Sequence, residues 1–219
     1  MSRTFRFRSG GFSLIVVLLM LLVVTVLALG AAQTSLVSER GARNDRDTEV
    51  AFQAAEAALL DAESDVLGPN DNARQRLCLF SSRDIAAFAA GCGAGGDRQG
   101  LCAPVEPGSE PAWTSADFSA DAGTSVAYGA FTGQTYLGGG GGAAASPRAG
   151  ALPARAPRYI VEAVRSHGGW QADQLQSASA EGARYLFRVT AIGYGAREET
   201  QVVLQTTLFK PVASPGCPS

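Results

Sequence analysis

Residues 10–32 read GGFSLIVVLLMLLVVTVLALGAA, and no charged residue interrupts them. As a helix, the part from Phe12 to Ala32 would be roughly 30 Å long, because each residue of an α-helix adds about 1.5 Å. This length matches the hydrocarbon core of a bilayer, so the run predicts a membrane-spanning helix over residues 12–32. Three arginines precede it and mixed charges follow it. The positive-inside rule therefore predicts a cytoplasmic N-terminus and an exported remainder of the chain.

Two ordinary kinds of N-terminal segment share this composition. A cleaved secretory signal would explain the small residues at 30–32, but the apolar run is longer than the roughly seven to fifteen residues usual in such signals. A plain signal anchor fits the length equally well. It gives no role to Gly10 and Gly11, which stand directly before the apolar run.

A third interpretation comes from residues 8–15, RSGGFSLI, which resemble the class III leader of type IV pilins and pseudopilins. The resemblance implies a leader over residues 1–11, cleavage by prepilin peptidase after Gly11 and N-methylation of Phe12. It also implies that residues 12–32 are kept, first as a membrane anchor and later as part of a filament core. The sequence departs from the pattern at the fifth mature residue, where most pilins carry Glu and this chain has Val16. In pilins this Glu is held to pair with a neighbour's N-terminal amine, so Val16 points to a tip or initiating position more than to the repeating shaft.

The helical pattern continues through residues 33–67, which we predict to be a periplasmic, amphipathic extension of the same helix. Strong helix formers dominate residues 51–63, no proline occurs before Pro69, and Gly68 with Pro69 gives a stop signal. The sequence thus predicts one continuous helix from Phe12 to Leu67. An apolar stripe at helical spacing is expected to pack on a sheet, and it consists of Phe52, Ala55, Leu59, Ala62 and Val66.

The same region carries a more specific resemblance. Residues 38–47, SERGARNDRD, followed by residues 51–59, AFQAAEAAL, resemble the juxtamembrane part of the minor pilin family PilX. A solvated, charge-laced helix that runs into an amphipathic one would explain the composition equally well. Both interpretations give the same helix, and they differ in whether its faces are specified for neighbouring subunits.

Residues 68–157 are the least regular part of the sequence. We expect a strand fragment at 77–80, a short helix at 84–90 and a flexible glycine-rich loop at 138–147. The chain has an even number of cysteines on its exported side, and an oxidising compartment favours two disulfides, with three possible connectivities. The cysteines are Cys78, Cys92, Cys102 and Cys217.

The last part, residues 158–219, changes to the period of β-strands. Strands are predicted at 159–165, 185–192 and 202–209, the last two joined by a glycine-containing hairpin. A sheet of three to four antiparallel strands with one apolar face needs a cover, and the helix stripe is available. We therefore predict an α+β, pilin-like fold. Residues 185–207 also resemble the C-terminal strands of PilX, so the resemblance covers both ends of the chain but not its middle.

No constellation for catalysis, a cofactor or a metal stands out. The cysteine spacings match no zinc pattern, the only histidine is His167, and no G-x-S-x-G motif occurs. A net charge of −2 gives no electrostatic case for nucleic-acid binding. We therefore expect a protein that is not an enzyme and needs no cofactor.

The resemblance implies a minor pilin of the type IV pilus that contributes to assembly initiation, a tip complex, adhesion and twitching motility. The expected partners are prepilin peptidase, other minor pilins, and the major pilin or a tip adhesin. The expected location is the bacterial inner membrane, with a single span and a periplasmic head, and later the pilus tip or cell surface. Two alternatives remain: a minor pseudopilin of type II secretion, whose tip subunit also lacks the acid but usually has a larger head, and a signal-anchored periplasmic binding module.

Overall fold

The computed structural model describes residues 12–68, 76–106, 108–119, 123–136, 152–166, 185–210 and 217. The predicted leader (1–11), the glycine-rich loop (138–147) and His167 lie outside these residues. The chain divides into two compact units, Met1–Arg46 and Asp47–Ser219. The second unit is called the head below.

One long helix, α1, runs over Phe12–Leu67, as the sequence predicts. It ends because Gly68 takes a left-handed conformation (φ +87°) that favours glycine, and its N–H donates to the carbonyl of Ser64 at 2.8 Å. The Lys210 ammonium donates to the carbonyl oxygens of Val66 and Leu77, each at 2.8 Å. Lys210 thus satisfies one of the carbonyls that the end of a helix leaves without a partner.

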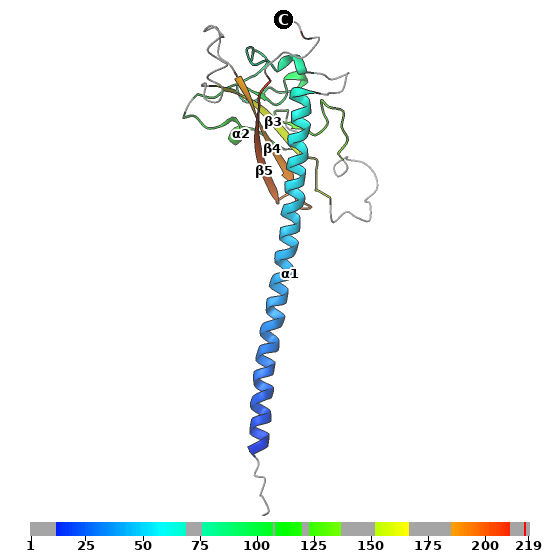
Figure 1. The fold of residues 1–219 in the computed structure, drawn as a ribbon, viewed down its shortest axis with the longest axis vertical. Coiled ribbons are helices and arrows are strands. Elements are labelled where there is room, and N and C mark those ends of the chain that lie inside the picture. Colours follow the sequence, from blue (N-terminus) through cyan, green and yellow to red (C-terminus); the bar gives the residue numbers. More distant parts are fainter. Residues whose placement is uncertain are drawn as a thin grey trace, which may run out of the picture. The chain divides into compact units, whose positions relative to one another are not determined.

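The head contains a mixed, mostly antiparallel sheet with the order β1-β3-β4-β5, and β2 also pairs with β3. The strands are β1 (Leu101–Cys102), β2 (Val126–Ala127), β3 (Arg158–Arg165), β4 (Tyr185–Tyr194) and β5 (Gln201–Leu208). The three long strands form the predicted antiparallel meander. β1 runs parallel to β3 and was not predicted. Figure 1 shows β3, β4 and β5 lying against the upper part of α1.

Two predictions for the irregular region are wrong. Leu77–Leu79 forms a 3₁₀ helix, η1, instead of a strand fragment. Residues 84–90 form turns with one isolated bridge, between Ala89 and Cys102, instead of a short helix. The remaining short elements are η2 (Gly96–Arg98) and α2 (Ala112–Ser115).

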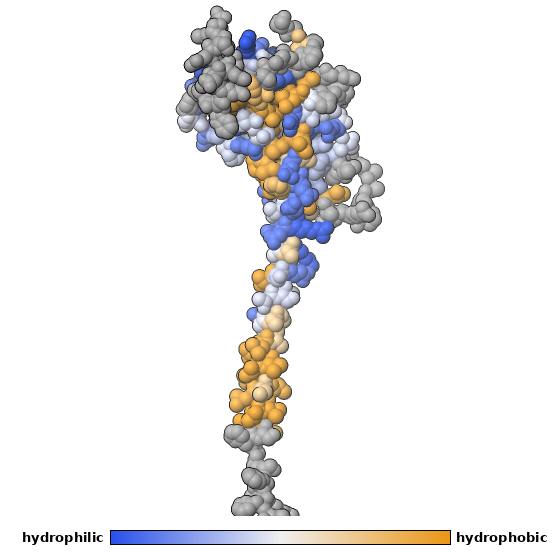
Figure 2. Space-filling model, viewed as in Figure 1, coloured by the Kyte–Doolittle hydropathy of each residue, from blue (hydrophilic) through white to orange (hydrophobic). Residues whose placement is uncertain are grey.

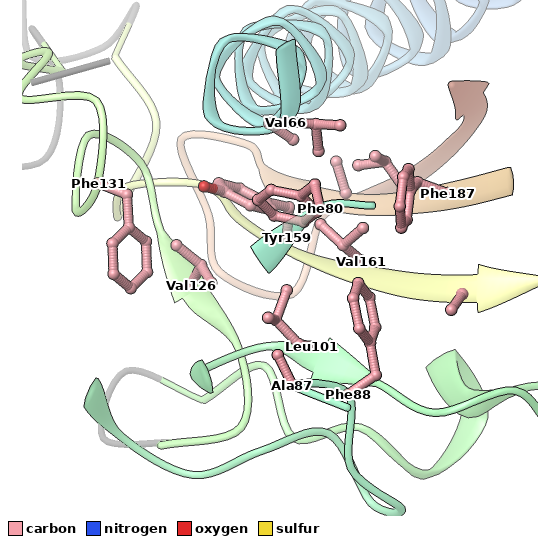
Figure 3. Close-up of a cluster of buried hydrophobic side chains, with 14 of the residues drawn as sticks. Val66, Phe80, Ala87, Phe88, Leu101, Val126, Phe131, Tyr159, Val161 and Phe187 are labelled. Atoms are coloured by element: carbon pink, nitrogen blue, oxygen red, sulfur yellow. The ribbon is translucent and has the colours of Figure 1, made fainter. Parts of the chain in front are cut away.

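The main hydrophobic core lies between α1 and one face of the sheet. In Figure 3, Val66 of α1 lies above the labelled side chains of the sheet and of the segments that flank it. Three aromatic rings fill its centre: Phe187 is 5.5 Å from Phe80, edge to face, and 5.7 Å from Phe88, stacked. Such ring pairs add to the free energy gained by burying their apolar area.

The helix face that packs on the sheet differs from the predicted stripe. Ala55, Ala62 and Val66 are fully buried and Leu59 packs at the edge of the core, but Phe52 is 39% exposed. Three alanines occupy the place expected for larger residues, and they are Ala51, Ala54 and Ala58. The reason is a close approach: a Cβ at Gly193 of β4 would lie 2.1 Å from the carbonyl oxygen of Ala51. A phenylalanine has no room there, so α1 turns Phe52 toward solvent.

The opposite face of the sheet is covered by the irregular region. A second cluster is formed by Cys92, Cys102, Ala112 and Ile160, with Ala116 and Phe118 beside it. The two disulfides are Cys92–Cys102 and Cys78–Cys217. The first lies inside this cluster, and the second links the turn after α1 to a position near the end of the chain. Of the three connectivities that the sequence left open, the structure has this one.

Candidate functional site

Among the described residues, the first half of α1 carries the most exposed large apolar side chains. Its large side chains from Leu14 to Leu29 are between 41% (Val16) and 74% (Leu14) exposed. α1 is long and apolar enough to cross a membrane, and the apolar window is not buried by any other described part of the chain. Figure 2 shows the segment as continuously hydrophobic on the face in view. A patch of this size is a surface for lipid or for other proteins.

Two hydroxyl groups, one in this segment and one just after it, are satisfied within the helix. The Thr25 hydroxyl donates to the carbonyl of Leu22 at 2.8 Å, and the Thr34 hydroxyl donates to the carbonyl of Gly30 at 2.6 Å. In a bilayer or among apolar helices, an unsatisfied hydroxyl would cost free energy because no water is present to bind it. The segment therefore suits an environment without water.

Two residues carry the predicted processing, Gly11 and Phe12. Gly11 is outside the described residues, and Phe12 is the first residue of α1. Val16 lies one turn further along, exposed on the helix surface, so a neighbouring helix can reach the position that usually carries Glu.

In the head, Asp47 binds the first residues of the head part of α1 to the sheet. Its carboxylate accepts hydrogen bonds from the N–H groups of Ala196 (2.6 Å) and Arg197 (3.3 Å), which belong to the β4–β5 hairpin. It also accepts from the Arg197 Nε (2.9 Å) and the Thr200 hydroxyl (2.5 Å). The bond from Thr200 is the largest of the interactions that lower the pKa of Asp47. The carboxylate is thus held in its charged form against the hairpin.

Near the other end of α1, Asp65 anchors the irregular region. It accepts a bifurcated hydrogen bond from the Arg76 Nε–H, at 3.0 and 2.8 Å, and a further bond from Arg76 Nη2. It also accepts from the Tyr159 hydroxyl at 2.9 Å, and both Asp65 and Arg76 are fully buried. Arg76 also donates to the carbonyls of Asp97 (3.1 Å) and Gln99 (2.6 Å). A buried ion pair is tolerated when hydrogen bonds satisfy its remaining atoms, as they do here.

A third aspartate, Asp61, lies between these anchors and accepts hydrogen bonds from the Gly129 N–H (2.8 Å) and the Thr132 hydroxyl. Burial raises the pKa of Asp61 and lowers the pKa of Lys210, which caps α1, to about 8. Sequence reasoning missed all three aspartates as packing residues. The available signal was that Asp61 and Asp65 stand next to Ala62 and Val66, on the apolar side of the helix.

No catalytic arrangement emerges from the part of the chain that the structure describes. Within it, no group of three His, Cys, Asp or Glu residues could hold a metal ion. A groove of about 390 Å³ runs between residues 104–111 and the end of β3, with Glu162 and Arg188 in its wall. These two side chains are paired with each other at 2.7 Å.

Comparison with protein families gives two matches, one over most of α1 and one over most of the head. The N-terminal model of PilX matches residues 10–60. The model described as "Type IV pilus assembly protein PilX C-term" matches residues 98–210, more than half of the chain. This chain belongs to the PilX family. PilX proteins form a structural, non-enzymatic family of pilus assembly proteins, and the exposed apolar helix of this member is consistent with membrane anchoring.

The PilX match extends further than the sequence resemblance, because it begins at residue 98 and includes part of the irregular region. That region supplies β1, β2 and the cluster behind the sheet. No curated protein and no solved structure matches the chain.

Proposed function

We propose that this PilX-family chain is a minor pilin of the type IV pilus and helps to initiate pilus assembly as part of a tip complex. The observation that carries the proposal is the apolar half of α1, which is exposed from Leu14 to Leu29 in a chain whose family assembles pili. We expect this half of α1 to act by packing against the helices of other subunits. The segment lies in the inner membrane until it leaves lipid for a bundle of similar helices.

Processing prepares this step. Prepilin peptidase cleaves after Gly11, and the new N-terminal residue, Phe12, is methylated. The N-terminus faces the cytoplasm and the head lies in the periplasm, which is also where the two disulfides would form. After assembly the head is displayed at the pilus tip or cell surface.

Val16 supports a tip or initiating position. An acid at the centre of a membrane helix costs about 2.5–3.5 kcal/mol on the insertion scale, and its pairing with a neighbour offsets that cost. A subunit with valine has neither the cost nor the attraction. It is held by apolar contacts alone, and its head contacts other minor pilins, the major pilin or a tip adhesin.

Mass spectrometry of the mature N-terminus tests the processing. We expect a chain that begins with N-methylated Phe12. A chain that begins near Gln33, or an uncut Met1, would contradict a pilin and favour a secreted or signal-anchored binding module.

Deletion of the gene tests whether the chain serves the type IV pilus or type II secretion. We expect loss of surface pili while the secretion of enzymes continues. Normal piliation with blocked secretion would instead identify a minor pseudopilin of type II secretion.

A further inference from the structure

Strand β5 forms one edge of the sheet. All its residues from Gln201 to Leu208 pair with β4 in an unbroken register, and no other strand of the described chain lies on its far side. In Figure 1, β5 is the last of the long strands in the meander. An edge strand carries a row of N–H and C=O groups that another strand can bind.

The hydrogen bonds show which groups point outward. The Gly195 N–H donates to the Thr200 carbonyl at 2.8 Å, directly beside the first pair of the β4–β5 ladder. Hydrogen-bonded pairs recur at every second residue of an antiparallel ladder, so the even-numbered residues of β5 bond to β4. The N–H and C=O groups of the odd-numbered residues therefore point away from β4. These residues are Gln201, Val203, Gln205 and Thr207.

This edge lacks the features that usually keep strands apart. Its sequence, QVVLQTTL, has no charged residue and no proline, and its register contains no bulge. Exposed edges without such features pair readily with other chains. Solubility alone would favour a lysine at such an edge. The absence of any of these features therefore suggests that the edge binds a partner.

The side of β5 that faces α1 is only half covered. Its Val202, Leu204, Thr206 and Leu208 are partly exposed. The β4 residues opposite the last three, Ala191, Val189 and Phe187, are fully buried. The cover given by α1 therefore ends between β4 and β5, and Figure 2 shows hydrophobic surface on this part of the head. One more strand beside β5 would bury these four partly exposed side chains.

The three undescribed segments that follow β2, β3 and β5 do not have the sequence of this strand. Residues 137–151 are mostly Gly and Ala, residues 167–184 read HGGWQADQLQSASAEGAR, and residues 211–216 contain two prolines. None has the alternating apolar pattern that a buried-edge strand needs. A strand from another chain therefore suits this edge better.

A second copy of this chain is a poor occupant in antiparallel pairing. β5 begins near Asp47, to which Thr200 is bonded, and leads to Lys210 at Val66, so it runs in the same direction as the head portion of α1. Two copies that paired their β5 strands in antiparallel fashion would direct these helix portions oppositely. Two chains inserted in one membrane with the same orientation have helices that run in the same direction, which antiparallel pairing of β5 would not allow.

We propose that β5 accepts an extended strand from a different protein of the pilus assembly. The donated strand is uncharged, six to eight residues long as typical strands are, and alternates apolar with polar side chains. Its apolar side chains lie over Leu204 and Leu208, next to α1. The proposal rests on the proposed function for the setting in which this partner is met.

The test is photo-crosslinking in cells that assemble pili. A benzophenone amino acid replaces Thr207 in the full-length chain, and the crosslinked peptide is sequenced. We expect an alternating, uncharged segment of another pilus protein. Val203→Pro removes one outward N–H and no bond to β4, and should lower the crosslink yield roughly tenfold. Val203→Thr keeps the N–H and should leave the yield unchanged.

Val203→Lys is a second variant, which places a charge on the edge without altering the backbone, and we expect the same loss. Equal unfolding midpoints of the purified variants would show that the head is intact. A crosslink to a second copy or to the chain's own residues would overturn the inference, as would the absence of a crosslink or a yield that neither variant lowers. If deletion abolishes pili but no such crosslink forms, only this inference fails. If deletion leaves pili intact, the proposed function fails.

Discussion

Gly193 is a residue at which α1 and the sheet approach closely. A Cβ there would lie 2.1 Å from the Ala51 carbonyl oxygen and 2.3 Å from the Ala55 nitrogen. Backbone atoms inside a helix cannot move aside, so we expect Gly193→Ala to lower the free energy of unfolding by at least about 2 kcal/mol. Chemical unfolding of the detergent-solubilised chain, followed by tryptophan fluorescence, measures the effect.

Gly41→Ala is the matched control. Gly41 lies in the same helix, a Cβ added to it would have no atom within 4 Å, and alanine favours helix. We expect no loss of head stability from it. Equal stability of Gly193→Ala and the wild type would show that the helix and sheet separate here without cost.

Asp47 predicts a specific dependence on acid. Because its pKa is lowered in the folded chain, the unfolded chain binds a proton first as the pH falls below about 3.8. The stability that Asp47 contributes is therefore fully present above that pH and is lost as the pH falls through the folded pKa. We expect Asp47→Asn to be less stable at neutral pH and to lose less stability in acid, as measured by thermal melts between pH 3 and 7.

Asp45→Asn changes the same charge two residues away, at an exposed position, and should leave the acid dependence as in the wild type. If the two variants behave alike, the hydrogen bonds from the hairpin do not control the titration.

Among the elements, the two disulfides constrain the chain very differently. Cys78 and Cys217 are 139 residues apart, whereas Cys92 and Cys102 are 10 apart. By the loop-entropy argument, replacing the first pair with alanine should cost about 5 kcal/mol and replacing the second about 3 kcal/mol. Urea unfolding of the two double variants gives the comparison. The opposite order would mean that burial of Cys92 and Cys102 outweighs the length of the closed loop.

The sequence predicts an element well when its pattern of apolar residues is long. The extent of α1 follows from its helix formers and stop signal. Alternation predicts β4 and β5 to within two residues at each end, and a run of mixed apolar character predicts β3 to within one. β1 and β2 have two residues each and show no period, so they were not predictable. Phe52 was misplaced because apolarity alone ranks phenylalanine above alanine, whereas a close helix–sheet contact selects for small size.

The candidate site divides in the same way. The exposed apolar segment can be predicted because it is continuous in sequence. The aspartate anchors cannot be predicted, since Asp47 binds Ala196 at a separation of 149 residues and Asp65 binds Tyr159 at a separation of 94 residues. No local pattern connects residues so far apart.

For the whole molecule, Val16→Glu tests how position 16 determines placement in the pilus. The new acid costs free energy in the membrane, and it restores the residue that pilins use to attract a neighbour's amine. We expect more of the chain to be incorporated along the shaft, as counted by immunogold labelling of sheared pili. Val17→Glu adds the same charge one residue away and should reduce incorporation. Unchanged piliation and incorporation of Val16→Glu would contradict our interpretation of this position.

Asp47 also has a mechanical consequence. It is the first residue of the head, so tension on α1 enters the head there. The bonds from Ala196, Arg197 and Thr200 end on one carboxylate, so they share a load that is applied there. Load sharing of this kind resists a pull better than bonds that open one after another. A pull on α1 would therefore load this carboxylate first, ahead of the buried contacts that Ala51 and Ala55 make further along the helix.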